Sequence, residues 1–329
     1  MTVGASAAPA ARGGERRRYR LNGLLVDSDR AFRFLVAAEA AGAPDVILRF
    51  GPVRRPDAAR IWQDRILSLH ADGDAFLEVP GAVTALIRGG REITVEAADG
   101  ATDAVLHNWV FGQAIGILCH QRGTPPLHAC VVEIGGRAVA LAGHSGSGKS
   151  TTARALIARG HGLLTDDQAI IDPDSLLVEP GWAAIKVWAN TAAAAGDRLD
   201  PALRVHAQLD KFQLPLEGAF RRTPTPLGLV VILRKGEPGE GPRGEMADWR
   251  RAAALLKTFV YRHRVGDALD GGRAQFAWSL ALARRAPVVT LRRPDDLAGV
   301  PALCDWIEQA AAGAAIAAAR PVEPVRSRA

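Results

Sequence analysis

The feature that most constrains this 329-residue chain is a glycine-rich loop at residues 143–150, which reads GHSGSGKS. The loop fits the pattern GxxxxGK[ST], in which glycines let backbone N–H groups converge on phosphate oxygens. An apolar run at 138–142 predicts a strand before the loop, and the pattern of 149–159 predicts a helix after it, capped by Gly160. A phosphate loop between a buried strand and a helix N-terminus indicates an α/β fold.

The residue types in the loop predict a nucleotide site. Lys149 is expected to reach the β- and γ-phosphates, and the Ser150 hydroxyl is expected to ligate Mg²⁺. The expected cofactors are therefore ATP and Mg²⁺. The predicted nucleotide-binding residues are Gly143, His144, Ser145, Gly146, Ser147, Gly148, Lys149, Ser150 and Thr151.

Two adjacent carboxylates, Asp166 and Asp167, end a predicted strand that follows the loop helix. A phosphate-loop site needs an acidic group near the metal, usually at the end of a neighbouring strand. One carboxylate would hold Mg²⁺ through water, and the other would take a proton from an acceptor hydroxyl. The two would titrate as a coupled pair. The residues favour Asp166 as the base and leave the opposite assignment open.

The chain divides by pattern into four parts. Residues 1–18 are small and basic and predict a disordered arm. Residues 19–103 alternate short apolar runs with Gly, Asp and Pro turns, which predicts a β-rich N-terminal module. Residues 104–312 mix helical and strand patterns and contain the loop, so they form the predicted catalytic domain. Residues 313–329 predict a disordered tail.

The same patterns place individual elements. Strands are expected at 19–28, 44–50, 76–79, 84–88, 92–97, 127–134, 137–142, 163–165, 169–171, 176–179, 227–234 and 288–291. Helices are expected at 104–121, 149–159, 191–196, 200–209, 247–263, 273–284 and 296–312. Residues 235–244 are expected to form a surface loop.

Taken alone, the net charge of +6 suggests a polyanion partner, but the positions of the charged residues argue against one. Residues 1–20 hold five arginines and one glutamate, and residues 314–329 hold three arginines and one glutamate. These two ends account for the whole excess, so a nucleic-acid partner is not expected. Only five of the 41 basic residues are lysines, so each lysine is a slightly stronger candidate for a functional role.

The compartment follows from the cysteines and from the absence of targeting patterns. The three cysteines, Cys119, Cys130 and Cys304, fit neither a disulfide framework nor a zinc site. No stretch is long and apolar enough to predict a membrane span, and the first 18 residues lack the apolar core of a secretory signal. We expect a cytoplasmic protein with no membrane partner and with oligomerisation possible.

The stretch 127–167, LHACVVEIGGRAVALAGHSGSGKSTTARALIARGHGLLTDD, resembles the C-terminal domain of HPr kinase/phosphorylase and its relatives. Four features carry the resemblance: a histidine before the hairpin, the GxSGxGKS form of the loop, RGH after the helix and the terminal DD. The resemblance implies a kinase core of the HPr kinase/phosphoenolpyruvate carboxykinase type. It implies that His128 lies near the catalytic carboxylates, that Asp166 activates the acceptor serine, and that Asp167 is the metal-side carboxylate.

The chain also departs from HPr kinases. The family carries a glycine-rich GLGxxD signature after the acidic pair, whereas residues 181–188 read GWAAIKVW. This departure argues against HPr as the acceptor. The arrangement looks more like the HPr-kinase-related serine kinases found beside peptide-modification genes, including lasso-peptide precursor kinases. Those proteins show a lysine before an apolar-Pro-apolar segment, and Lys211 in KFQLPL fits that description. Lys211 is thus a candidate for phosphate or acceptor contact.

The predicted activity is ATP- and Mg²⁺-dependent phosphorylation of a Ser or Thr hydroxyl on a peptide or small protein, such as a lasso-type precursor. Asp166, supported by His128, would accept the hydroxyl proton, while Lys149 and Lys211 would contact phosphate. Arg262 and Arg264 are candidates to neutralise transition-state charge. The alternatives are an HPr(Ser) kinase, a kinase of free serine, and a nucleotide-binding regulator with little transfer activity.

Overall fold

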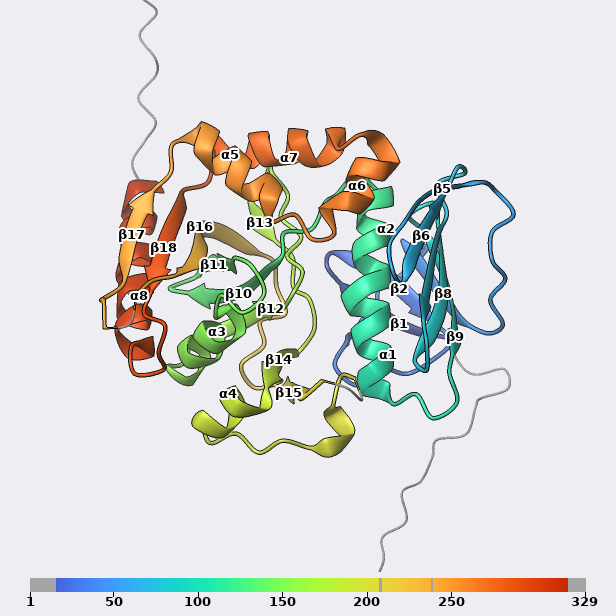
Figure 1. The fold of residues 1–329 in the computed structure, drawn as a ribbon, viewed down its shortest axis with the longest axis horizontal. Helices are drawn as coiled ribbons and strands as arrows, with labels where there is room; N and C mark the ends of the chain where they lie inside the picture. Colours follow the sequence, from blue (N-terminus) through green and yellow to red (C-terminus); the bar gives the residue numbers. More distant parts are fainter. Residues whose placement is uncertain (1–15, 207–208, 238, 319–329) are drawn as a thin grey trace, which may run out of the picture.

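A computed structural model describes residues 16–206, 209–237 and 239–318 (Figure 1). Most of the predicted N-terminal arm and the end of the predicted tail lie outside the described residues. Two β-rich bodies lie on either side of a long central helical segment, which stands between them in Figure 1. No described helix has both the length and the apolar character needed to cross a membrane.

The N-terminal body is a nine-stranded sheet in the order β3-β1-β2-β4-β9-β8-β7-β6-β5. Its strands are β1 (Arg17–Leu21), β2 (Leu24–Ser28), β3 (Val36–Ala37), β4 (Val46–Phe50), β5 (Arg60–Gln63), β6 (Leu67–His70), β7 (Ala75–Val79), β8 (Val83–Arg88) and β9 (Glu92–Ala97). The strand expected at 19–28 is two strands, because Asn22 and Gly23 both adopt positive φ and form a tight hairpin turn. β3, β5 and β6 were not predicted.

The helix expected at 104–121 forms as three consecutive segments. They are α1 (Asp103–Trp109), the π-helical η1 (Val110–Ala114) and α2 (Ile115–Gln121). Its buried side chains, including Leu106, Phe111 and Ile115, join the module's strands in one hydrophobic core. Trp182 and Val265, from the second body, belong to the same core. The helical segment therefore attaches the two bodies to each other.

The second body is built on a mixed sheet in the order β12-β10-β11-β16-β18-β17, with β13 paired to β16. Its strands are β10 (Ala129–Ile134), β11 (Arg137–Ala142), β12 (Gly162–Thr165), β13 (Leu177–Val178), β16 (Thr225–Lys235), β17 (Arg243–Met246) and β18 (Val288–Arg293). β11, β16 and β18 are parallel, whereas β10 pairs with β11 as the predicted hairpin. A separate antiparallel pair is formed by β14 (Ala184–Trp188) and β15 (Lys211–Pro215).

Helices cover both faces of this mixed sheet (Figure 1). α3 (Lys149–Ala158) and α8 (Val300–Ala318) contribute Leu156 and Ile307 to the core on one face. α5 (Trp249–Thr258) and α7 (Arg273–Ala283) contribute Leu256 and Leu282 to the core on the other face. The remaining helices are α4 (Ala189–Ala194), the 3₁₀ turn η2 (Pro201–Leu203) and α6 (His263–Asp270).

Other expectations about elements were also wrong, among them the arm, because Arg17 and Arg18 belong to β1, and the loop at 235–244, whose ends belong to β16 and β17. Of the helix expected at 200–209, the described residues form only η2, because Arg204 returns to an extended backbone. The helix expected at 247–263 ends at Thr258, and Arg262 adopts a left-handed backbone before α6. Residues 169–171 form isolated bridges rather than a strand. α8 starts later than expected and continues to Ala318, past the predicted start of the tail.

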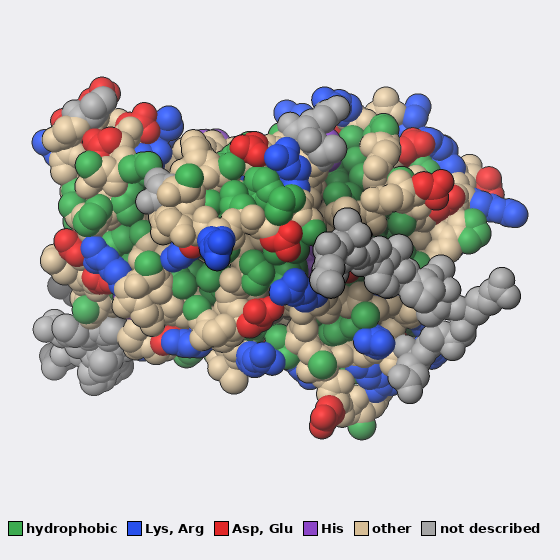
Figure 2. Space-filling model, turned by 90° about the horizontal axis from the view of Figure 1, so that it is seen from below, with side chains coloured by type: hydrophobic (Ala, Val, Ile, Leu, Met, Phe, Trp, Pro, Cys, Tyr) green, Lys and Arg blue, Asp and Glu red, His purple; other side chains and the backbone are tan. Residues whose placement is uncertain are grey.

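The charge of the folded part is distributed over its surface. On the face drawn in Figure 2, Lys and Arg side chains are interspersed with Asp and Glu side chains, and hydrophobic side chains reach the surface between them. Among the described residues many charged side chains are paired, as in Arg159 with Asp305 and Arg251 with Glu245. The described surface on this face therefore gives no extended basic patch of the kind that nucleic-acid binding requires.

Candidate functional site

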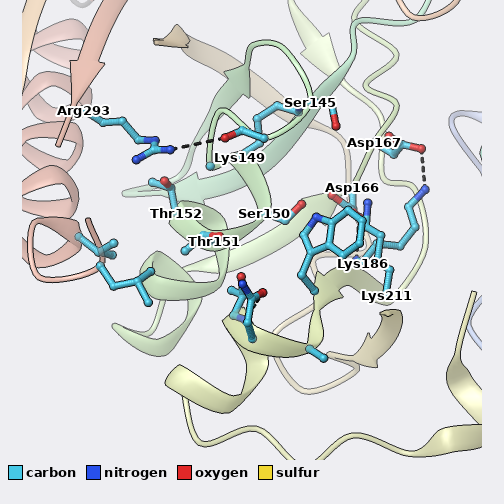
Figure 3. A pocket seen from close by; sticks show the side chains of 18 of the residues that line it. Ser145, Lys149, Ser150, Thr151, Thr152, Asp166, Asp167, Lys186, Lys211 and Arg293 are labelled. Carbon is cyan, nitrogen blue, oxygen red and sulfur yellow. Dashed lines mark hydrogen bonds and ion pairs between the residues drawn. The ribbon is translucent and has the colours of Figure 1, made fainter. Parts of the chain in front are cut away.

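A cleft of about 910 Å³ lies over the N-terminus of α3. The glycine loop forms its middle (Figure 3). Arg293 lies on one side of the loop, whereas Asp166, Asp167, Lys186 and Lys211 lie on the other side. The sheet positions the loop, because buried β11 ends at Ala142 and α3 begins at Lys149.

Loop geometry depends on three glycines with positive φ: 147° at Gly143, 79° at Gly146 and 96° at Gly148. At Gly143 a Cβ would lie 2.7 Å from the Leu233 carbonyl oxygen, so no larger residue fits there. The Lys149 ammonium donates to the carbonyls of Gly143 and His144 at 2.8 and 3.2 Å. Burial lowers the pKa of Lys149, although Asp167 and Asp166 partly oppose that shift.

Arg293, which the sequence did not single out, braces the loop from the end of β18. Its Nε donates to the Ser147 carbonyl at 2.6 Å. A Cβ added at Gly148 would lie 2.8 Å from this Nε, so glycine is needed for the close approach. Its guanidinium therefore lies against the backbone of the phosphate loop, 3.3 Å from the Asp295 carboxylate.

Asp167 is held by a lysine ammonium and a histidine ring, and Figure 3 shows its contact with Lys186. Lys186 Nζ lies 2.6 Å from one carboxylate oxygen, and His128 Nδ1 lies 3.3 Å from the other. His128 Nδ1 also lies 3.1 Å from the Asp167 carbonyl oxygen. Asp167 has a φ of 75°, a conformation that is uncommon outside glycine and that clusters at functional sites.

The pKa shifts of Asp167 and Lys186 follow from burial and ion pairing together. Burial by itself raises the pKa of Asp167, but Lys186 and His128 more than offset that effect, so its pKa lies well below the usual range. Burial by itself lowers the pKa of Lys186, but the Asp167 and Asp166 carboxylates outweigh that effect, so the pKa of Lys186 is raised. Asp167 and Lys186 are therefore both charged at neutral pH.

Asp166 is almost fully buried and has a different environment. Its Oδ2 accepts a hydrogen bond from the Lys186 backbone N–H at 2.8 Å. His128 was expected to support Asp166, but the structure places its ring against Asp167 instead. The reason is local: the positive φ of Asp167 turns its carboxylate and carbonyl toward the start of β10, where His128 lies.

The cleft brings together most of the predicted site residues. Those that line it are His128, Ser145, Gly146, Gly148, Lys149, Ser150, Thr151, Asp166, Asp167 and Lys211. Lys211 begins β15, where its ammonium lies 5.6 Å from the Trp188 ring centroid. Lys186 also lines the cleft, within the segment where HPr kinases carry their glycine-rich signature, and its only sequence signal was the scarcity of lysines.

Other predicted residues do not line the cleft. Gly143, His144 and Ser147 belong to the loop but are not among the lining residues, and the His144 ring packs 5.0 Å from the Phe259 ring. Arg262 and Arg264 do not line the cleft either. Arg262 instead contacts Asp64 of the N-terminal body at 3.0 Å and Gln113 at 2.6 Å.

The donor set fits Mg²⁺. Ser150 supplies a hydroxyl oxygen, and Asp166 and Asp167 supply carboxylate oxygens to the same cleft. Among the described residues no group of three or more His, Cys, Asp or Glu side chains is arranged around a common metal position. One hydroxyl and two carboxylates suit Mg²⁺, which is bound through one or two protein groups together with substrate phosphates and water.

The family comparison matches this region of the chain. Residues 123–176 match the family model described as HPr Serine kinase C-terminal domain. The match contains the hairpin, the loop and the acidic pair, so the resemblance seen in 127–167 is confirmed for that stretch. No curated protein matches the chain in sequence.

Solved structures give a weaker likeness. One match is the structure of the Hpr(Ser) kinase/phosphatase from Coxiella burnetii, at 14% identity, covering 59% of this chain and 97% of that chain with a TM-score of 0.29. A TM-score this low does not establish a shared fold. The family likeness is therefore that of an HPr-serine-kinase-like segment, residues 123–176, which carries the phosphate loop and the acidic pair of the cleft.

Proposed function

We propose that the protein is an ATP- and Mg²⁺-dependent kinase that phosphorylates a Ser or Thr hydroxyl of a peptide or small protein. One observation carries the proposal: the glycine loop with Lys149, the Asp166-Asp167 pair and His128 line one cleft, within a segment that matches HPr serine kinases. All three cysteines are buried free thiols, which is consistent with a reducing, cytoplasmic setting.

The two ends of the cleft suggest how the nucleotide lies. The segment after Arg293 lines the cleft with the apolar Leu297 and Val300, which suit a nucleoside, together with Asp295 and Asp296. At the opposite end are the acidic pair and Lys211, which suit an acceptor hydroxyl and the transferred phosphoryl group. The phosphates would then lie over the loop amides and Lys149, between the two ends.

In the proposed mechanism the protein works by positioning and electrostatics. Asp166 accepts the hydroxyl proton, because both carboxylate oxygens of Asp167 already contact Lys186 and His128, which hold the pKa of Asp167 well below its usual range. Lys149 stabilises charge on the phosphoryl oxygens. Ser150 and Asp167 would hold Mg²⁺, which when bound neutralises charge on the β- and γ-phosphates. His128 fixes the orientation of Asp167.

The proposed acceptor is a peptide, with a lasso-type precursor as the first candidate. HPr is the second candidate, and the match of residues 123–176 to the HPr serine kinase domain favours it. Transfer of labelled phosphate to HPr, to a linear precursor peptide and to free serine distinguishes these acceptors. ATP binding with no transfer to any of them would identify a nucleotide-binding regulator instead.

The loop assignment is tested with Lys149→Ala. Loss of the ammonium should lower the transfer rate by at least about 100-fold, the size seen when one group that stabilises transition-state charge is removed. Lys257→Ala is the matched control, since Lys257 lies on α5 outside the cleft. Near-normal transfer by the Lys149 variant, with its fold confirmed by circular dichroism, would refute the assignment.

The two carboxylates are distinguished by isosteric variants. Asp166→Asn should abolish the proton acceptor and lower kcat by about 100-fold or more, with little change in the Mg²⁺ concentration for half-maximal activity. Asp167→Asn should raise that Mg²⁺ concentration. If Asp167→Asn instead lowers kcat and Asp166→Asn raises the Mg²⁺ concentration for half-maximal activity, Asp167 is the base and Asp166 is the metal-side carboxylate.

A further inference from the structure

A second cavity of about 850 Å³ lies between the N-terminal body and the second body. Its walls come from the β5–β6 turn, the β7–β8 turn, the residues around α1, the η2 segment and Arg262. We call it the docking groove. The proposed mechanism uses none of its residues.

The docking groove adjoins the phosphate cleft along three pairs of consecutive residues. Asn108, Val205 and Tyr261 line the cleft, whereas their neighbours Trp109, His206 and Arg262 line the groove. The Trp109 and His206 rings, whose centroids are 6.2 Å apart, join two of these elements. A chain lying in the groove would therefore be next to the acceptor end of the cleft, where Asp166 and Asp167 lie.

The lining of the docking groove combines apolar side chains with three arginines. Its apolar lining includes Ile66, Pro80 and Trp109. The lining contains three arginines and one aspartate, and that aspartate, Asp64, is paired with Arg262. Arg65 is exposed, and no ion pair or hydrogen bond of its guanidinium is found in the described part of the chain.

We propose that the docking groove binds the acceptor as an extended peptide segment that combines apolar with acidic side chains. This inference rests on the proposed kinase function and names the substrate class of the same site. The apolar lining suits Leu, Val or Ile side chains, and Arg65 suits a Glu or Asp carboxylate. The position of the groove lets the segment place a Ser or Thr hydroxyl in the cleft.

Charge and shape favour a peptide over a nucleic acid. The groove has a small positive excess, whereas nucleic-acid binding requires a longer basic track that neutralises several phosphates. Arg204 is already paired with Asp210, and Arg262 with Asp64, which leaves Arg65 as the lining arginine for which the described residues show no partner. One such guanidinium beside an apolar surface fits a single carboxylate.

The test measures peptide binding directly and without ATP. The probes are two fluorescein-labelled peptides of about ten residues, long enough to span about 33 Å when extended. Both have a central Ser and several Leu residues, and one carries Glu where the other carries Lys. Fluorescence anisotropy gives Kd for the wild-type chain and for Arg65→Glu. Arg91→Glu is the matched control, with the same charge change on the same body outside the groove.

The Glu peptide should bind the wild-type chain at least about tenfold more tightly than the Lys peptide. Arg65→Glu should remove or invert that preference, while Arg91→Glu should retain it. Equal binding of the two peptides, or an unchanged preference in Arg65→Glu, would overturn the proposal. Tighter binding of a single-stranded RNA that displaces the Glu peptide would also overturn it.

The kinase assay is a separate readout of the same samples. If the Glu peptide binds through Arg65 and neither it nor HPr, a linear precursor peptide or free serine receives phosphate, the proposed function fails while the docking groove stands as a peptide site. If free serine is phosphorylated in a Lys149-dependent manner and neither peptide binds, the kinase stands and the docking groove proposal fails.

Discussion

At the scale of single residues, Lys186 and Asp167 form a nearly buried ion pair in the cleft. The ammonium is nearly buried and lies 2.6 Å from the carboxylate. Removing one partner of a buried pair leaves the other charge without compensation, which costs far more than the pair itself contributes. Lys186 also fixes Asp166 through its backbone N–H, so one residue orients both carboxylates.

Lys186→Met should therefore lower the free energy of unfolding by about 3 kcal/mol at pH 7. The additional change Asp167→Asn should recover part of that loss, because it removes the uncompensated carboxylate. Urea unfolding of the wild-type chain, both single variants and the double variant measures the coupling. Purely additive losses would contradict a direct interaction between the two charges.

The pH dependence of the stability that Asp167 and Lys186 contribute follows from the directions of their pKa shifts. Asp167 has a lowered pKa, so its contribution to stability is present above the unfolded value of about 3.9 and is lost as the pH falls through the folded value. Lys186 has a raised pKa, so its contribution is complete below about 10.4 and is lost at higher pH. The deficit of Lys186→Met should therefore be largest near neutral pH. The deficit should shrink as the pH falls and the Asp167 carboxylate of the variant becomes protonated.

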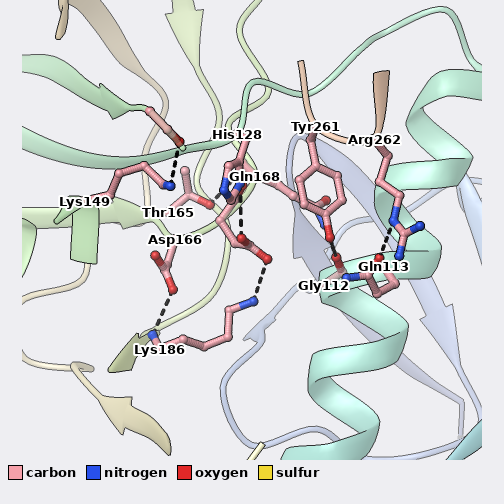
Figure 4. A network of polar contacts seen from close by, with 12 residues as sticks. Gly112, Gln113, His128, Lys149, Thr165, Asp166, Gln168, Lys186, Tyr261 and Arg262 are labelled. Atoms are coloured by element: carbon pink, nitrogen blue, oxygen red, sulfur yellow. Dashed lines mark hydrogen bonds and ion pairs between the residues drawn. The ribbon is translucent and has the colours of Figure 1, made fainter. Parts of the chain in front are cut away.

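At the scale of elements, η1, the π-helical part of the central helical segment, connects that segment to the site. Gln168 Nε2 donates to the Gly112 and Phe111 carbonyls at 2.6 and 3.2 Å, and the Tyr261 hydroxyl also donates to Gly112 (Figure 4). Carbonyls in a π segment are displaced from the regular helical pattern, and such segments occur often at functional sites. Gln168 follows Asp167 directly, so the contact anchors the acidic pair to the helix.

Gln168→Leu should remove this anchor. The Phe111 carbonyl would lose its side-chain donor and the Gly112 carbonyl would lose one of two, and we expect a loss of about 1–3 kcal/mol in stability. Because Asp167 is the preceding residue, kcat should fall while KM for ATP changes little. Tyr261→Phe is the matched control: it removes one hydrogen bond to the same carbonyl and is not adjacent in sequence to the acidic pair. Equal kcat losses in both variants would argue against a specific effect on Asp167.

At the scale of the whole molecule, one hydrophobic core crosses the boundary between the two bodies. Phe32 of the N-terminal body packs edge-on against Phe111 of η1, with ring centroids 4.7 Å apart. Trp182 and Val265 of the second body belong to the same cluster. The walls of the docking groove come from both bodies as well. The N-terminal body and the site should therefore unfold as one unit.

Phe32→Ala should lower the free energy of unfolding by about 3–5 kcal/mol, the usual cost of removing a buried aromatic ring. Far-UV circular dichroism and loss of binding of a fluorescent ATP analogue should report the same transition midpoint. Phe276→Ala, at a position 55% exposed on α7, is the control and should change stability by less than about 0.5 kcal/mol. Separate midpoints for the two probes would show that the bodies unfold independently.

The sequence by itself determined the features that depend on neighbouring residues. The hairpin of β10 and β11, the glycine loop and α3 follow from turn glycines, apolar runs and a helix start within some 30 residues. Their hydrogen bonds are local, so propensity and pattern suffice to predict them. The same local signals failed at Asn22-Gly23, where a hairpin turn was read as strand, and at 200–209, where apolar spacing was read as helix.

Only the tertiary structure decided which side chains meet in the cleft. Arg293 lies 146 residues from the Ser147 carbonyl it binds, and Lys186 lies 19 residues from Asp167, on a strand pair that was not predicted. His128 contacts Asp167 rather than Asp166 because of one left-handed backbone conformation. Such contacts depend on the order in which strands assemble into sheets. That order is set by burying apolar faces from distant segments together, which no local pattern encodes.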